Sequence, residues 1–179
     1  MTIKTILFVF ILFVQAAFAR QPVVGEKAPD FMLKTLQGKK IRLHDLRGQV
    51  VLLDFWASWC GPCKLEMPYL NMLQKIYGRE GFKVVAVNID NKFPNAVKFI
   101  EKTGVKLVVL WDGKKQVVKS YDVDTMPTSF LIDQTGTIRH INSGFQTEDF
   151  QSYKKQTARL LNNKARRRFV KTRKSSPAN

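Results

Sequence analysis

The chain has 179 residues, enough for one domain of ordinary size. Apolar residues make up 45% and charged residues 25%, close to globular averages, which argues against a wholly disordered chain. Two cysteines are too few for a disulfide-rich scaffold or for a zinc site built on three or four thiolates. The formal net charge of +16 is large for this length and indicates an anionic partner or surface.

The first 19 residues have the three parts of a secretory signal peptide. Lys4 supplies a positive charge, Ile6–Val14 is an unbroken apolar run, and Ala17–Ala19 (AFA) places small residues at a cleavage site. The apolar run is too short to span a membrane comfortably. We therefore expect export and cleavage, with a mature chain that begins at Arg20 in the periplasm or an equivalent extracytoplasmic space. The alternative is a retained N-terminal anchor that tethers the domain to the membrane.

Strand and helix patterns alternate from residue 23 onward. A hairpin comes first, and a buried strand, a helix that begins at the cysteines and a second buried strand follow it. Next come a short helix, a short apolar stretch, one or two helical turns, a second hairpin and a final helix with one apolar face. In chain order, these segments are Phe31–Leu36 with Lys39–Leu43, Val50–Ala57, Cys60–Tyr77, Phe82–Ile89, Asn95–Thr103, Val105–Leu110, Gln116–Tyr121, Thr128–Asp133 with Thr137–Ser143, and a helix after Thr147. The order predicts an α/β domain over residues 23–162, with a mixed central sheet, helices on both faces and an added N-terminal hairpin.

The two cysteines, Cys60 and Cys63, directly follow the first buried strand and open a helix. Unpaired N–H groups and the helix dipole favour a thiolate there, and such a position lowers a cysteine pKa from about 8.5 to about 3.5–7.5. The spacing also lets the two sulfurs close a small disulfide ring. A zinc site would need two further ligands, and the chain offers only His44 and His140, which are not at metal-ligand spacing. The pattern predicts a redox dithiol that uses no metal and no other cofactor.

The residues around this pair resemble a known family. The stretch Leu53–Lys64 (LDFWASWCGPCK) is similar to the active-site strand and helix of thioredoxin. The opening Val24–Phe31, together with Glu66–Pro68, is similar to the exported TlpA/ResA-like thioredoxins, as is Gly38 with Leu43. The stretch Met126–Asp133 (MPTSFLID) resembles the cis-proline loop of that family and the strand after it. The resemblance covers roughly residues 23–162 and implies a thioredoxin-like fold.

This resemblance also implies how the pair works. Cys60 would attack a substrate disulfide and form a mixed disulfide, and Cys63 would then attack Cys60 and release the reduced substrate. We expect the attacking cysteine to be exposed and the resolving cysteine to be more buried. The Gly61-Pro62 pair between them is that of reducing thioredoxins, whose potential is about −270 mV, against about −120 mV for strong oxidants. The resemblance therefore favours a reductase.

The same resemblance predicts a surface that binds substrate. Pro127, after Met126, would form a cis peptide opposite the cysteines and leave a backbone edge free for a substrate chain. Trp59, Gly61 and Pro62 complete the expected surface, with Trp59 as a packing residue and contact beside the pair.

Two acidic residues are candidate proton carriers. Asp54 interrupts an apolar strand, where an unpaired carboxylate is costly, so we expect it to be partly protonated or to meet a polar partner. By resemblance it is the buried aspartate of thioredoxin, a proton acceptor for Cys63, although Ala86 stands where thioredoxin has the lysine partner of that aspartate. Glu66 is on the same helix face as Cys63 and corresponds to a glutamate near the family's active-site cavity. The alternatives are an Asp54 that reaches solvent at the strand end and a solvated Glu66 paired with a lysine.

The chain ends in a basic segment, residues 163–179, which we expect to be a disordered tail. Seven of residues 162–179 are Lys or Arg, and no acidic residue follows Asp149. Three interpretations stay open: an inert solvated tail, attachment to anionic lipid or envelope polymer, and nucleic-acid binding. Export and the lack of interleaved aromatic residues argue against nucleic acid.

The predicted function is that of an exported thiol–disulfide oxidoreductase that reduces protein disulfides in the cell envelope. The family resemblance adds apocytochrome c before haem attachment as a substrate. The expected partners are disulfide-containing envelope proteins and a membrane thiol–disulfide electron donor. One alternative is a disulfide oxidant or a peroxide-linked thiol protein, although the Thr-x-x-Cys arrangement of peroxiredoxins is absent before Cys60. The other is a non-catalytic envelope-binding module that uses the basic tail, against which the intact cysteine pair argues.

Overall fold

The computed structural model describes residues 20–174, with side chains through residue 162. The expected signal peptide, residues 1–19, lies outside the described residues. In chain order the elements are β1 (Met32–Thr35), β2 (Lys40–Arg42), η1 (Leu43–Leu46), β3 (Val50–Trp56), α1 (Gly61–Tyr77), η2 (Gly78–Glu80), β4 (Phe82–Asn88), α2 (Phe93–Thr103), β5 (Val108–Trp111), α3 (Gln116–Ser120), β6 (Thr128–Ile132), β7 (Ile138–Ser143) and α4 (Asp149–Lys174).

The strands form one mixed sheet in the order β2-β1-β5-β4-β3-β6-β7. Strands β3, β4 and β5 run parallel, whereas β6, β7, β1 and β2 pair antiparallel with their neighbours. The N-terminal hairpin joins the sheet through β5, where Thr35 pairs with Leu110. The α/β fold with a mixed sheet and an added hairpin is therefore confirmed.

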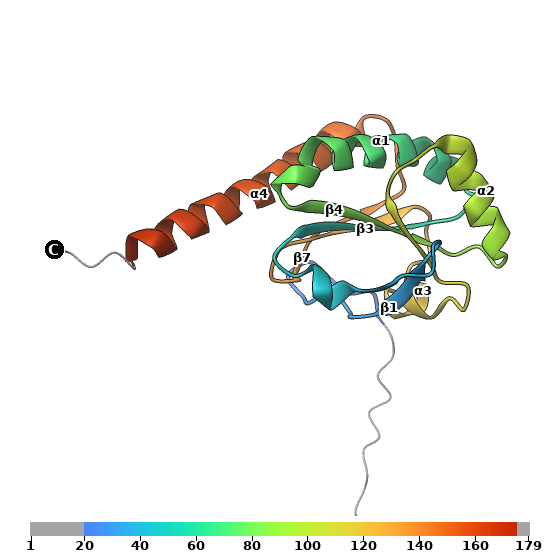
Figure 1. Ribbon diagram of the computed structural model, residues 1–179, viewed down its shortest axis with the longest axis horizontal. Helices are drawn as coiled ribbons and strands as arrows, with labels where there is room; N and C mark the ends of the chain where they lie inside the picture. The colour runs from blue at the N-terminus through green and yellow to red at the C-terminus, as the bar shows by residue number, and fades with distance from the viewer. Residues whose placement is uncertain (1–19, 175–179) are drawn as a thin grey trace, which may run out of the picture.

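Helices α1, α2 and α4 lie over one face of the sheet and α3 lies on the other (Figure 1). Helix α1 connects β3 to β4 and α2 connects β4 to β5, so both connections step in the same direction across the sheet. Because such crossovers are right-handed, both helices lie on the same face. Helix α4 packs beside α1 there, and the Tyr77 hydroxyl of α1 donates a hydrogen bond to the Lys154 carbonyl of α4 at 3.5 Å.

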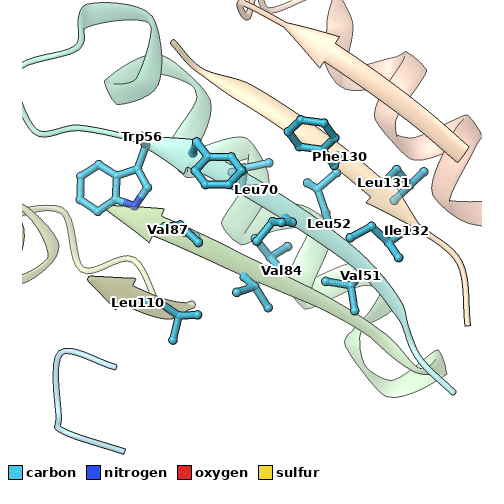
Figure 2. Close-up of a cluster of buried hydrophobic side chains, with 14 of the residues drawn as sticks. Val51, Leu52, Trp56, Leu70, Val84, Val87, Leu110, Phe130, Leu131 and Ile132 are labelled. Carbon is cyan, nitrogen blue, oxygen red and sulfur yellow. The ribbon is translucent and has the colours of Figure 1, made fainter. Parts of the chain in front are cut away.

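Strand β3 is buried at every position because layers cover both faces of the sheet. Leu52 of β3 is in register with Val84 of β4 on one side and Leu131 of β6 on the other. Figure 2 shows these side chains in one apolar cluster that Leu70 of α1 joins. The fully buried strand places its last residue, Trp56, directly before the loop that carries the first cysteine.

Helix α4 does not end where the sequence suggested. It runs to Lys174, so residues 163–174 of the expected tail are helical, and this second half extends beyond the sheet (Figure 1). The reason is local, because lysine, arginine and alanine favour helix and neither glycine nor proline occurs between Asp149 and Pro177. The remaining tail residues, 175–179, lie outside the described residues. None of the described helices combines the length and the apolar character that a membrane crossing requires.

Replacing Leu70 by alanine should lower the free energy of unfolding by about 2–5 kcal/mol, because this side chain is fully buried against the sheet. Leu65 is the matched control, since it is on the same helix but 45% exposed. Leu65→Ala should change stability by no more than about 0.5 kcal/mol. Urea unfolding of the oxidised protein measures both variants. Equal losses would show that the packing of α1 on the sheet contributes little.

Candidate active site

The two cysteines form a disulfide at the junction of β3 and α1. Cys60 is the N-cap of α1, and its Sγ accepts the Cys63 backbone N–H at 3.1 Å. Pro62 lies in the first turn of α1, where backbone N–H groups have no partner within the helix. The N–H that proline lacks therefore costs no helical hydrogen bond. Cys63 is fully buried and Cys60 is only 5% exposed. The order of burial is the expected one, but Cys60 is not exposed in this disulfide form because its sulfur is tied to a core residue.

The expected substrate-binding residues surround the disulfide from two segments of the chain. Trp59 is 65% exposed, and Gly61 and Pro62 are exposed with it. The Met126–Pro127 peptide is cis. Because β6 runs antiparallel to β3 and Thr128 pairs with Phe55, this peptide lies at the sheet edge where β3 ends and the cysteines begin.

A buried aspartate holds the loop that precedes the cysteines. The Asp90 carboxylate accepts the Ser58 backbone N–H at 3.1 Å and the Asn88 side-chain N–H at 3.1 Å. The Trp111 indole N–H donates to the Asp90 carbonyl at 3.0 Å. These bonds hold the Ser58 backbone, two residues before Cys60, against the end of β4.

Asp54 and Glu66 form a second buried acidic group. Each side chain is 1% exposed, which excludes both a solvent-facing Asp54 and a solvated Glu66. No N–H or hydroxyl of the described residues donates to either Asp54 oxygen, and Glu66 Oε2 also has no partner there. The group beside Asp54 is the Glu66 carboxyl, which donates a hydrogen bond when it is protonated. The expected polar partner of Asp54 is therefore Glu66.

The sheet and α4 complete this group. In register, Ala86, Asp54, Ser129 and Asn142 form one row across β4, β3, β6 and β7. Tyr153 of α4 reaches down to the row, where its hydroxyl donates to Glu66 Oε1 at 2.9 Å and lies 3.0 Å from Ser129 Oγ.

Burial sets the protonation of both carboxyl groups. It raises the pKa of Asp54 to about 7, and a hydrogen bond from Glu66 offsets part of that rise. Burial and the neighbouring charge of Asp54 raise the pKa of Glu66 well above its usual range, and Asp149 adds to this. Two carboxylates this close in a low-dielectric site cannot both ionise easily. The pair therefore keeps at least one proton near neutral pH.

Sequence patterns did not identify Tyr153, Ser129 or Asp90 as site residues. Tyr153 fits the apolar face of the last helix, and Ser129 lies between Thr128 and Phe130 at the start of an otherwise apolar strand. Asp90 had one usable signal: it follows β4, and the carboxyl ends of the parallel strands β3 and β4 lie at the same edge of the sheet. No cluster of three or more side chains that could ligate a metal occurs within residues 20–162.

Asp54→Asn should change how the stability of the oxidised protein depends on pH. The folded-state pKa is raised, so Asp54 contributes stability below about pH 4 and that contribution is lost as the pH rises through about 7. The asparagine does not titrate, so the variant does not lose this stability. Between about pH 4 and 7 its free energy of unfolding should rise by a few kcal/mol relative to that of the wild type. Urea unfolding at several pH values measures the difference. Parallel stability curves would contradict a raised pKa.

Proteins of similar sequence and structure are thiol–disulfide oxidoreductases, in agreement with the cysteine pair described above. Residues 24–141 match the AhpC/TSA family. Two similar relatives are the thiol-disulfide oxidoreductases ResA of Geobacillus thermodenitrificans, 43% identical over 70% of this chain and 72% of the relative, and of Bacillus subtilis, 40% identical over 69% of each. A thiol:disulfide interchange protein DsbE of Chlorobium tepidum has a similar structure, with a TM-score of 0.75 and 43% identity over 78% of this chain and 98% of that one. With its Cys60–Cys63 pair at a strand–helix junction, the chain belongs to the ResA- and DsbE-like thiol–disulfide oxidoreductases of thioredoxin-like fold.

Proposed function

We propose that this oxidoreductase is exported and that it reduces protein disulfides in the cell envelope, apocytochrome c among them. The observation that carries the proposal is the placement of the dithiol, with Cys60 capping α1 beside an exposed Trp59 and Cys63 behind it in the core. The Gly61-Pro62 pair supports the reducing direction. The leader pattern in residues 1–19 supports export.

The two half-reactions follow from this placement. The Cys60 thiolate attacks one sulfur of the substrate disulfide, so that a Cys60–substrate bond forms and the other substrate sulfur leaves as a thiolate. The Cys63 thiolate then attacks Cys60 Sγ, which closes the Cys60–Cys63 bond and releases the second substrate thiolate. The substrate gains two electrons, and the protein is left in the disulfide form described above. A membrane thiol–disulfide donor would reduce the pair again.

Asp54 is the proposed proton acceptor for Cys63 in the second half-reaction. The thiol of a fully buried Cys63 has no bulk water to receive its proton, so a buried base must take it. A carboxyl whose pKa is raised to about 7 is suited to this, because near neutral pH it can both accept and return a proton. Glu66 would assist by sharing its own proton with Asp54.

The second helical half of α4 is the proposed attachment point for anionic lipid or an envelope polymer. Its sequence is strongly basic from residue 164 onward, and the helix extends beyond the sheet, clear of the cysteine site (Figure 1). Each basic residue near an anionic surface adds up to about 1 kcal/mol to such attachment.

The potential of the couple tests the direction of the reaction. A redox titration against glutathione should give a midpoint nearer about −270 mV than about −120 mV. Cys63→Ser, which cannot close the ring, is the blank for this titration, and it should also trap the substrate as a mixed disulfide on Cys60. A midpoint above about −180 mV, the value of isomerases, would favour the alternative of a disulfide oxidant.

Asp54→Asn should slow the release of the mixed disulfide by about 10²–10⁴-fold, because the amide cannot accept the Cys63 proton. Attack by Cys60 should change much less, since that step uses a thiolate that is already formed. Stopped-flow kinetics on a small disulfide separates the two steps.

Asp112→Asn is the matched control for this experiment. Asp112 is also buried, but its carboxylate accepts the Gln116 and Val118 backbone N–H groups at the start of α3. The control should resolve the mixed disulfide at the wild-type rate. If Asp54→Asn also does so, Asp54 is structural and Glu66 becomes the base to test.

A further inference from the structure

Tyr153 has a role in this site that its helix position does not suggest. It is 2% exposed, and it bridges Glu66 of α1 to Ser129 of β6 through a single hydroxyl. Burial raises the pKa of this tyrosine, and the nearby Glu66 charge adds to the rise, so the hydroxyl stays protonated and remains a donor. The ring packs against Phe145, with 5.9 Å between ring centroids. A buried hydroxyl needs a hydrogen-bond partner, and the identity of these two partners, a carboxyl oxygen and a serine hydroxyl, is what bears on the site.

The hydrogen bonds that connect Asn142, Ser129, Tyr153 and Glu66 all run in the same donor-to-acceptor direction. The Asn142 side-chain amide donates to Ser129 Oγ at 3.4 Å. Tyr153 has one hydroxyl proton, which it donates to Glu66 Oε1, so the 3.0 Å contact with Ser129 takes its proton from the serine. The hydrogen bonds thus run in one direction, from Asn142 to Ser129, from Ser129 to Tyr153 and from Tyr153 to Oε1 of Glu66.

This direction decides where the Glu66 proton lies. Oε1 is occupied as an acceptor, so the proton of the neutral carboxyl is on Oε2, which has no other partner within the described residues. The Asp54 oxygens beside it have no other donor within residues 20–162. In the oxidised protein, a proton on Oε2 is therefore the one hydrogen of this part of the chain that can satisfy the Asp54 carboxylate.

We propose that Tyr153 is a positioning residue, which holds Glu66 with its proton on Oε2 and directed at Asp54, and so keeps Asp54 available as a base. Without the hydroxyl, Oε1 is equally able to carry the proton and Glu66 can turn it away from Asp54. Asp54 then loses its hydrogen-bond donor and holds its own proton more tightly. The predicted rise in the proton affinity of Asp54 does not depend on the proposed function. Only the predicted effect on the resolution of the mixed disulfide rests on that function.

The titratable groups that face Glu66 come from two neighbouring elements. Asp54 lies on β3, and Asp149 and Tyr153 lie on α4. In the oxidised protein the two cysteines are bonded to each other and do not titrate. The oxidised form therefore isolates the behaviour of the carboxyl pair.

The test is a titration of the Asp54 and Glu66 carboxyl carbons by ¹³C NMR in the oxidised protein. Tyr153→Phe keeps the ring and removes the hydroxyl, and it should raise the Asp54 midpoint by about one pH unit, a tenfold change in proton affinity. Tyr77→Phe is the matched control, because the Tyr77 hydroxyl also bridges α1 to α4 but bonds to the Lys154 carbonyl. It should leave both midpoints unchanged. An unchanged Asp54 midpoint in Tyr153→Phe, or an equal shift in Tyr77→Phe, would overturn the proposal.

Two variants at position 66 separate positioning from simple packing. In a Glu66→Met background no donor remains for Tyr153 to orient, so adding Tyr153→Phe should produce no further shift of Asp54. In a Glu66→Gln background the amide N–H₂ takes the place of the proton. Adding Tyr153→Phe should then raise the Asp54 midpoint again, because the amide is free to flip. A further shift in the Met background, or none in the Gln background, contradicts the proposed orientation.

Kinetics connects the titration to the reaction. In Tyr153→Phe the pH profile of mixed-disulfide resolution should move to higher pH by the same interval, so that the rate falls about tenfold below the midpoint and is unchanged above it. A shifted titration with an unshifted rate profile would uphold the positioning role and reject Asp54 as the base. A rate that falls equally at all pH values would reject the positioning role in the reaction.

Discussion

Two buried carboxyl groups that cannot both ionise easily are the main electrostatic constraint on this site. Asp54 and Glu66 are held together between the sheet and α1, where water does not reach them. In such surroundings a second negative charge has no solvent to offset it, and no salt bridge within residues 20–162 involves either carboxyl group. The pair can therefore bind and release a proton near neutral pH, as the acceptor proposed for the Cys63 proton must. The same burial that destabilises the ionised carboxyl raises its proton affinity, which is the property that the proposed base requires.

Two aspartates in this region are equally buried but differ in their hydrogen-bond donors. Asp54 and Asp90 are equally buried, at 1% exposure. Asp90 receives N–H donors from Ser58 and Asn88, so its carboxylate is satisfied and it anchors the loop before Cys60. Asp54 has no such donor among the described residues and depends on the proton of Glu66. The first aspartate is suited to hold position, and the second is suited to change its protonation state.

Helix α4 has two halves that differ in their surroundings and charge. Its first half packs on α1 and places Tyr153 at the carboxyl pair. There the Phe150 ring lies tilted against the Tyr69 ring of α1, with 5.1 Å between their centroids. Its second half is basic and extends beyond the sheet (Figure 1). One continuous helix therefore links the buried carboxyl pair to the segment proposed to meet an anionic surface.

Local patterns in the sequence determined the fold class, the order of strands and helices, and the dithiol at the start of α1. These are properties of neighbouring residues: alternation and runs of apolar side chains, and two cysteines at a strand–helix junction. The burial of Glu66, its meeting with Asp54 and the reach of Tyr153 were decided only by tertiary structure. Glu66 and Tyr153 are 87 positions apart, and Asp54 and Ser129 become neighbours only through the register of β3 with β6. No periodicity within one segment carries that information, because these contacts depend on how α1 and α4 pack across the same row of the sheet.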